Sequence, residues 1–129
     1  MQVYQKRITV SKGDLDDLNH VNNVRYLQWV QDVASEHWQQ NVTETILDQY
    51  FWVVVSHHIE YKSAAVLDDN IRIDTYVIRS EGVTSTRIVE MYHDTTNKLL
   101  VKAETIWCLM NKSSSRPARI TPEIAELFN

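Results

Sequence analysis

Residues 23–40 carry the only long helical pattern in the chain, and that pattern is apolar around most of the helix. On a wheel drawn at about 100° per residue, the polar side chains form one narrow stripe, consisting of Arg25, Gln28, Asp32, Ser35, Glu36 and Gln39. The apolar side chains fill well over half of the circle, namely Val24, Tyr26, Leu27, Trp29, Val30, Val33, Ala34 and Trp38. A surface helix has a narrower apolar stripe. The pattern therefore predicts a helix that other parts of the structure enclose.

The other long segments show the two-residue alternation, or the β-branched and aromatic composition, of β-strands. We expect strands at 2–10, 50–62, 71–79, 84–93 and 99–110, with short helical turns at 41–49 and 121–128. Turn residues, including those at 67–70, join the last four strands, so strands that follow one another in the chain should be antiparallel neighbours. A single antiparallel sheet must cover its apolar face, and one long helix is available for this. The sequence predicts an α+β fold, a five-stranded antiparallel sheet wrapped around one central helix.

Composition and charge narrow the class of protein. We expect the 129 residues to form one domain, since that length supports a substantial core. A net charge of −4 and the lack of a Lys or Arg block argue against nucleic-acid binding. We expect no signal peptide and no membrane span, because no segment approaches the roughly 18 consecutive apolar residues required. The single cysteine, Cys108, is typical of a protein in the reducing cytoplasm.

The segment just before the helix, residues 14–22, concentrates aspartates, a histidine and asparagines. Asn22 is the expected N-cap, because its short side-chain oxygen can accept a bond from a first-turn N–H. The remaining first-turn N–H groups and the positive end of the helix dipole would then face this loop. Such a place favours a carbonyl oxygen that is gaining negative charge. The structural alternative is a capped helix start with Asx turns.

Residues 14–29 read Asp-Leu-Asp, then His-Val-Asn-Asn-Val, a basic residue and Tyr, with a Trp nearby. In this motif the chain closely resembles the hotdog-fold thioesterases. It is most similar to the acyl-ACP thioesterase branch (ACP, acyl carrier protein), and 4-hydroxybenzoyl-CoA thioesterases share the Asp-x-Asp and the helix that follows. The resemblance implies a hotdog fold and a hydrolase that cleaves acyl thioesters of CoA or ACP without a cofactor.

The resemblance also implies roles for single residues. The catalytic carboxylate falls on Asp16, and the N–H that polarises the thioester carbonyl falls on Asn23 or its neighbour Val24. His20 matches the motif histidine. We expect Asp16 either to activate water or to attack the carbonyl directly. His20 and Asn19 would position the acid, the water or the thiolate leaving group.

Two departures from the family pattern bear on function. The acyl-ACP branch has a catalytic asparagine two positions before its histidine, where this chain has Leu18, with Asn19 one place along. The basic cluster of some CoA-dependent relatives corresponds to residues 80–83, which are not basic. Leu18 favours a second hypothesis, a module that binds acyl thioesters without turnover. A third is a hydroxyacyl-thioester dehydratase, for which the helix should carry a buried acid.

No metal site is expected. The acidic loop 14–25 hints at a calcium loop, but Leu18 and Arg25 occupy the fifth and twelfth ligand positions. His57 and His58 should point to opposite faces of their strand and so cannot share one metal ion.

The strand at 50–62 is long and apolar, so it would be a pairing liability if it lay at an exposed edge of the sheet. We therefore expect a homodimer that pairs edge to edge, or a dimer of dimers, with each active site built from two subunits. His57, His58 or Tyr61 would then reach the partner's helix start. Together with Asn19, Asn22 and Val24, these residues are the expected substrate-binding set.

Overall fold

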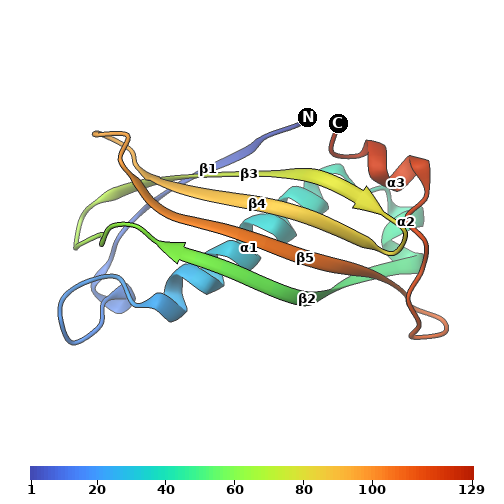
Figure 1. The fold of residues 1–129 in the computed structure, drawn as a ribbon, viewed down its shortest axis with the longest axis horizontal. Helices are drawn as coiled ribbons and strands as arrows, with labels where there is room; N and C mark the ends of the chain where they lie inside the picture. Colours follow the sequence, from blue (N-terminus) through green and yellow to red (C-terminus); the bar gives the residue numbers. More distant parts are fainter.

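The computed structural model describes residues 1–129 and shows one long helix lying across one face of a five-stranded sheet (Figure 1). The strands are β1 (Tyr4–Thr9), β2 (Tyr50–Tyr61), β3 (Asn70–Glu81), β4 (Thr84–His93) and β5 (Leu99–Asn111). They are hydrogen-bonded in the order β1-β3-β4-β5-β2, and every neighbouring pair is antiparallel. β1 and β2 are therefore the two edges of the sheet.

The helical elements are the 3-10 turn η1 (Lys12–Asp14), the long helix α1 (Asn23–Asn41), α2 (Glu44–Gln49) and α3 (Pro122–Glu126). The predicted α+β hotdog fold, with a five-stranded antiparallel sheet and one long helix, is confirmed. The expected pairing of the 50–62 strand with the 71–79 strand is wrong: β2 pairs with β5, and β3 lies between β1 and β4. The connection from β2 to β3 therefore crosses the sheet instead of forming a hairpin. The ends of some elements also differ. β3 extends to Glu81 because the β3–β4 hairpin closes tightly at Gly82, whose φ of +63° suits glycine.

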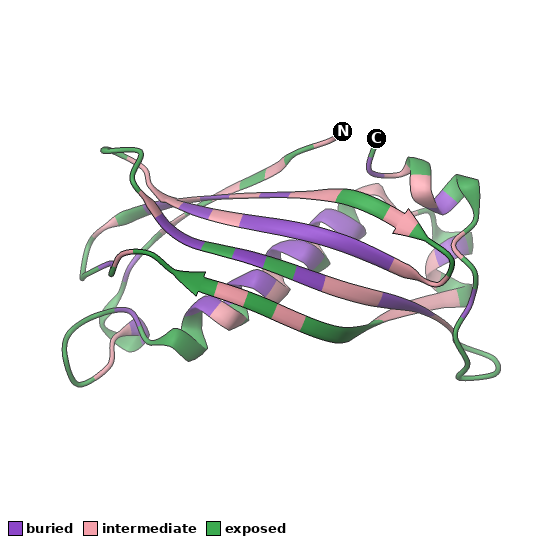
Figure 2. Cartoon of the chain, viewed as in Figure 1, coloured by how far each residue is buried: buried purple, intermediate pink, exposed green.

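Helix α1 is buried on one side only, which corrects the expectation of a helix enclosed around most of its girth. The side toward the sheet is buried, through Tyr26, Trp29, Val30, Val33, Ala34, His37 and Trp38 (Figure 2). On the opposite side Gln28, Ser35 and Gln39 are exposed, as their polarity predicts. Val24, however, is 72% exposed. Within one chain the curled sheet covers one flank of α1 and leaves the first turn open.

The inner face of the sheet supplies the apolar surface that α1 covers. Val30 and Val33 belong to one buried cluster with sheet residues Ile71, Ile73, Val89, Met91, Val101 and Ala103. A second cluster surrounds Trp38 near the end of α1, with Ile46, Leu109, Ala118, Ile124 and Phe128. α2 and α3 therefore close the end of the sheet beside the C-terminal half of α1, and the N-terminal end of α1 meets a loop instead (Figure 1).

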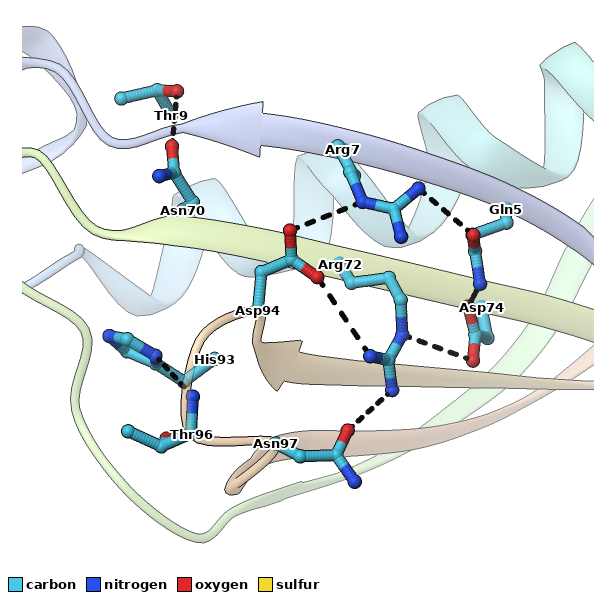
Figure 3. Close-up of polar contacts among 10 residues, drawn as sticks. All are labelled: Gln5, Arg7, Thr9, Asn70, Arg72, Asp74, His93, Asp94, Thr96 and Asn97. Atoms are coloured by element: carbon cyan, nitrogen blue, oxygen red, sulfur yellow. Dashed lines mark hydrogen bonds and ion pairs between the residues drawn. The ribbon is translucent and has the colours of Figure 1, made fainter.

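The outer face of the sheet is polar, and near the β3–β4 side it carries a network of charged groups (Figure 3). Arg7 Nε lies 3.1 Å from Asp94 Oδ2, and Arg72 lies 3.7 Å from Asp74 and 3.9 Å from Asp94. Such surface ion pairs contribute roughly 0 to 1 kcal/mol each. These ion pairs show which face of the sheet contacts solvent, and they contribute little to the free energy of unfolding.

The loop before α1 is held by Asp14, which is buried. Its carboxylate accepts from Ser11 N–H (2.8 Å) and from Arg25 Nε (2.6 Å). Burial by itself would raise the pKa of Asp14, but the hydrogen bonds from Ser11 and Arg25 outweigh it and the pKa is lowered. The loop is also tied to the segment after β2, because Val21 N–H donates to the Ala65 carbonyl (3.0 Å). Residues 14–22 are thus a fixed loop.

We predict that Trp38→Ala lowers the free energy of unfolding by about 3 to 5 kcal/mol, since it leaves a cavity in the second cluster. Trp38 is 7% exposed and meets Trp52 edge-on at 5.6 Å between ring centroids. The neighbouring exposed Gln39→Ala should change the same quantity by less than about 0.5 kcal/mol. Urea unfolding at one fixed protein concentration measures both, and equal effects of the two variants would contradict the burial described here.

We predict that Asp14→Asn lowers the unfolding free energy near pH 7 by roughly 1 to 3 kcal/mol, as expected for charged hydrogen bonds. Because the folded-state pKa of Asp14 is lowered, its contribution is present above the unfolded value of about 3.9 and is lost as pH falls through the folded value. The difference between wild type and variant should therefore shrink below about pH 4. Asp17→Asn, in the same loop but exposed, is the control. A pH-independent difference would contradict the prediction.

Candidate active site

A cavity of about 220 Å³ lies where loop 14–22 meets the first turn of α1 and the end of β2. The residues that line it are Asp16, His20, Val21, Asn23, Tyr26, Tyr61, Lys62, Ser63 and Ala64. The fold thus brings together all three residues predicted as catalytic, Asp16, His20 and Asn23. Of the six predicted as substrate-binding, it adds only Tyr61 in the same chain.

The Asp16 carboxylate is oriented by its own loop. Its Oδ1 accepts from the N–H of Leu18 (2.9 Å) and of His20 (3.2 Å). The backbone of Asp16 donates in turn to the His20 carbonyl (2.8 Å). Oδ2 makes no hydrogen bond with the chain. One oxygen therefore holds the side chain in place, and the other is free to receive a proton or to contact a ligand.

The start of α1 leaves one N–H group free beside this carboxylate. Asn22 is the N-cap as predicted, and its Oδ1 accepts from Val24 N–H (2.9 Å). The N–H groups of Arg25 and Tyr26 donate to the Asn22 carbonyl. Asn23 N–H has no acceptor within the chain. Of the two N–H groups named from the sequence, Asn23 therefore offers the free one and Val24 is occupied by the cap.

Aromatic side chains form the wall opposite the loop. The Tyr26 hydroxyl is buried and accepts from Ala65 N–H (3.2 Å), and its ring lies 5.9 Å from that of Tyr61. Burial is the largest cause of the raised pKa of Tyr26, so its hydroxyl is neutral. The His20 ring is exposed and makes no hydrogen bond with the chain. The cavity therefore combines a carboxylate, an imidazole, a free N–H and two phenol rings.

Three expected site residues of the loop and helix start do not line the cavity. Asn19 is exposed at the tip of the loop, where its φ of 61° lies in the left-handed region that Asn tolerates. Asn22 is committed to the cap, and Val24 faces solvent. Leu18, which stands where the acyl-ACP branch has asparagine, is 75% exposed and also lies outside the cavity.

The two histidines of β2 also lie outside this cavity and point to opposite faces of the sheet, as the alternation predicts. His57 is on the inner face, where its Nδ1 lies 2.8 Å from Thr105 Oγ1. Its Nε2 is buried without a partner, and burial lowers its pKa. His58 is on the outer face, 3.7 Å from Glu60. Within one chain neither histidine reaches Asp16.

Five lining residues were not predicted: Val21, Tyr26, Lys62, Ser63 and Ala64. A signal existed for Tyr26, because a hydroxyl on the buried side of a helix needs a polar partner. Residues 62–64 had no signal in sequence. They reach the site through pairing of the loop with the segment after β2, including the bridge between His20 and Val66.

Two further features concern metal ions and membranes. Nowhere do three or more His, Cys, Asp or Glu side chains gather in a way that could hold a metal ion. None of the helices combines the length and the apolar character needed to cross a membrane.

Solved structures with the same fold are named as thioesterases. The probable thioesterase YbaW from Escherichia coli has a TM-score of 0.87 and 21% identity, with 95% of this chain and 94% of that chain covered. The 1,4-dihydroxy-2-naphthoyl-CoA thioesterase Slr0204 from Synechocystis has a TM-score of 0.84 and 13% identity, covering 98% and 95%. The 12:0-ACP thioesterase from Umbellularia californica has a TM-score of 0.85 and 16% identity, covering 98% of this chain and 51% of that one.

No curated protein sequence matches the chain significantly. The sequence model of the thioesterase-like superfamily matches residues 10–128. The fold, the cavity at the helix start and this match agree, and the chain belongs to the thioesterase-like superfamily.

Proposed function

We propose that this protein hydrolyses acyl thioesters of CoA or ACP to a free acid and a thiol. The observation that carries the proposal is the meeting, in one cavity, of the unbonded Asp16 oxygen and the free N–H of Asn23. Membership of the superfamily supports the reaction class. The structural neighbours include proteins named for a CoA substrate and for an ACP substrate, so both carriers stay within the proposal.

The proposed chemistry needs a nucleophile and a place for negative charge. In one route Asp16 Oδ2 takes a proton from water while the water oxygen bonds to the thioester carbon. In the other, Asp16 itself attacks that carbon, and water then cleaves the resulting anhydride. In both, the carbon–sulfur bond breaks and the thiolate leaves. Asn23 N–H and the dipole of the 19-residue helix α1 stabilise the oxyanion.

Other lining residues take supporting roles in the proposal. His20 is placed to give a proton to the departing thiolate or to orient the water, and Asn19 to order the loop that holds it. Asp16 is the only acid that lines the cavity. The helix acid Glu36 accepts from Tyr4 (3.0 Å) and Lys6 (2.9 Å). Neither Glu36 nor Asp32 lines this cavity, so α1 offers no acid here of the kind a dehydratase would use.

We predict that Asp16→Asn lowers kcat for thioester hydrolysis by about 10²- to 10⁴-fold, the usual contribution of a general base. Asparagine keeps an acceptor oxygen for Leu18 and His20 N–H, so the loop should hold and the thioester should still bind. Thiol release measures the rate on a panel of acyl chain lengths, each presented on CoA and on ACP. Asp17→Asn, an exposed neighbour without side-chain hydrogen bonds, should retain wild-type rates.

Thiol release by the wild type and by Asp16→Asn distinguishes a thioester hydrolase from a module that only binds acyl thioesters. Binding without thiol release by the wild type would favour the acyl-binding module over the hydrolase. Full activity in Asp16→Asn would show that another group is the base or nucleophile.

We also propose that the protein is a homodimer, or a dimer of dimers, that pairs through β2. This twelve-residue strand is an edge of the sheet, and its Val53, Val54 and Val55 are 37%, 36% and 58% exposed. An apolar edge of this length invites pairing with another strand. In such a dimer His57, His58 and Tyr61 would have a route to the partner's helix start, where Asn22 and Val24 border the substrate.

We predict that Val55→Lys shifts the protein toward monomer in sedimentation velocity, because a lysine on an edge strand opposes pairing. Val3→Lys places the same charge before β1, at the opposite edge, and should leave the dimer unchanged. A wild-type monomer at micromolar concentration would contradict the proposed assembly.

A further inference from the structure

A second cavity, of about 410 Å³, lies between α1 and the sheet beside β2 and shares no lining residue with the Asp16 cavity. Its aromatic wall consists of Trp38, Tyr50, Phe51, Trp52, Trp107 and Phe128. The volume lies in the range of small-molecule sites, which are mostly apolar with a few fixed polar groups. The proposed hydrolysis does not explain this space.

The one buried charged side chain in this cavity has no counter-ion. Arg87, on the inner face of β4, is 4% exposed and lines the cavity. Its Nη1 donates to His37 Nδ1 (2.9 Å) and to Thr75 Oγ1 (3.1 Å), and the guanidinium lies 5.0 Å from the centre of the Phe128 ring. It forms none of the ion pairs of the chain. A buried charge without a partner is unfavourable.

One edge of the guanidinium has no partner in the chain. Nε and Nη2 make no hydrogen bond with the chain, and neither is among the fully enclosed polar atoms that lack a partner. Arg87 is one of the residues that line the cavity. Nε–H and Nη2–H point in parallel from one edge of the group, which matches the two oxygens of a carboxylate.

The charge on Arg87 is not cancelled by its neighbour. Burial lowers the pKa of Arg87 to about 10, so the side chain stays protonated at neutral pH. Burial and then the charge of Arg87 lower the pKa of His37 to about 4, so His37 is neutral. His37 Nδ1 therefore accepts from Arg87, and its Nε2–H donates to Gln2 Oε1 (2.6 Å).

Other lining residues surround Arg87. Trp107 lies on β5, diagonally across from Arg87 on the same face of the sheet, and its Nε1 is fully enclosed, so the ring and not the N–H borders the cavity. Two further charged residues of opposite sign, Asp32 and Lys112, are among the sixteen residues of the lining. Asp32 accepts from Gln28 (2.8 Å), so its charge is partly satisfied on α1.

We propose that this cavity binds an apolar organic acid, whose carboxylate lies on the free edge of Arg87 and whose apolar body lies among the tryptophans. The carboxylate has two sources: a free monocarboxylic acid, or the far end of a dicarboxylic acyl group carried as a thioester. The second source rests on the proposed thioesterase activity. The first does not, so binding is testable by itself.

The test uses the intact protein, with decanoate and decanol as a matched pair of probes. Three of the four tryptophans line the cavity, so their fluorescence reports occupancy, and calorimetry measures affinity. Decanoate should bind at least tenfold more tightly than decanol. Arg87→Gln should weaken decanoate at least tenfold and leave decanol unchanged. Equal binding of the two probes to wild type, or unchanged decanoate affinity in Arg87→Gln, would overturn the proposal.

Arg87→Lys keeps the positive charge and removes the paired Nε–H and Nη2–H donors, so it tests the site even if Arg87→Gln fails to fold. Its affinity for decanoate should fall several-fold while decanol is unaffected, and an unchanged ratio would count against the site. Asp16→Asn should bind decanoate like wild type, because the two cavities share no residue. Absence of thioester hydrolysis by the wild type, together with decanoate binding, would leave this inference intact while the proposed function fails.

A second arm identifies the source of the carboxylate. Decanoyl-CoA is compared with the CoA thioester of decanedioic acid, which has one free carboxylate. If the substrate carries that group to Arg87, Arg87→Gln raises KM for the dicarboxylic thioester alone. If KM changes equally for both, the cavity takes the free acid.

Discussion

The contact between one side of α1 and the inner face of the sheet determines where every functional group of this protein lies. Val30 and Val33 share a buried cluster with strands β3, β4 and β5, so the helix cannot slide along the sheet without opening its core. This packing places the first turn of α1 beside the segment that follows β2. The loop that carries Asp16 is then tied to both by backbone hydrogen bonds. The candidate active site is a consequence of that register.

The residues around the N-terminal end of α1 differ in kind from those along the rest of the helix, and each set lines its own cavity. At the N-terminal end, polar backbone and a carboxylate meet in a small space lined partly by tyrosines. Along the rest of the helix, tryptophans and phenylalanines surround a larger space in which one arginine is the main charged group. The first arrangement suits a reaction at a carbonyl. The second suits recognition, because a desolvated guanidinium discriminates strongly between ligands with and without a matching anion.

Sequence patterns predicted the architecture because the spacing of apolar residues within each segment identifies it as a helix or a strand. Alternation in β1 and β3, the wide apolar pattern of α1 and the Asn22 cap are local properties, and the structure reproduces them. Sequence reasoning expected α1 to be enclosed on more sides than one chain encloses. The exposed Val24 shows the limit, because a wheel reports which side chains are apolar and not how much partner surface is available. Arg87 alternates with the apolar residues Val89 and Met91, so the sequence already indicated a charged side chain on the apolar face of this strand. Sequence reasoning did not use that signal.

By itself the sequence determined the elements, the order of the chain through them, the capped helix start and the motif that marks Asp16, His20 and Asn23. These depend on residues within one turn or one strand of each other. Tertiary structure alone decided that Tyr26 and residues 61–64 complete that cavity, that Asn23 and not Val24 presents a free N–H beside the carboxylate, and that Arg87 faces His37. The completion of the cavity and the position of Arg87 depend on contacts between residues 39 and 50 positions apart, which only the packing of the helix on the curled sheet brings together. The free N–H of Asn23 follows from the local cap, but its place beside the cavity depends on the same packing.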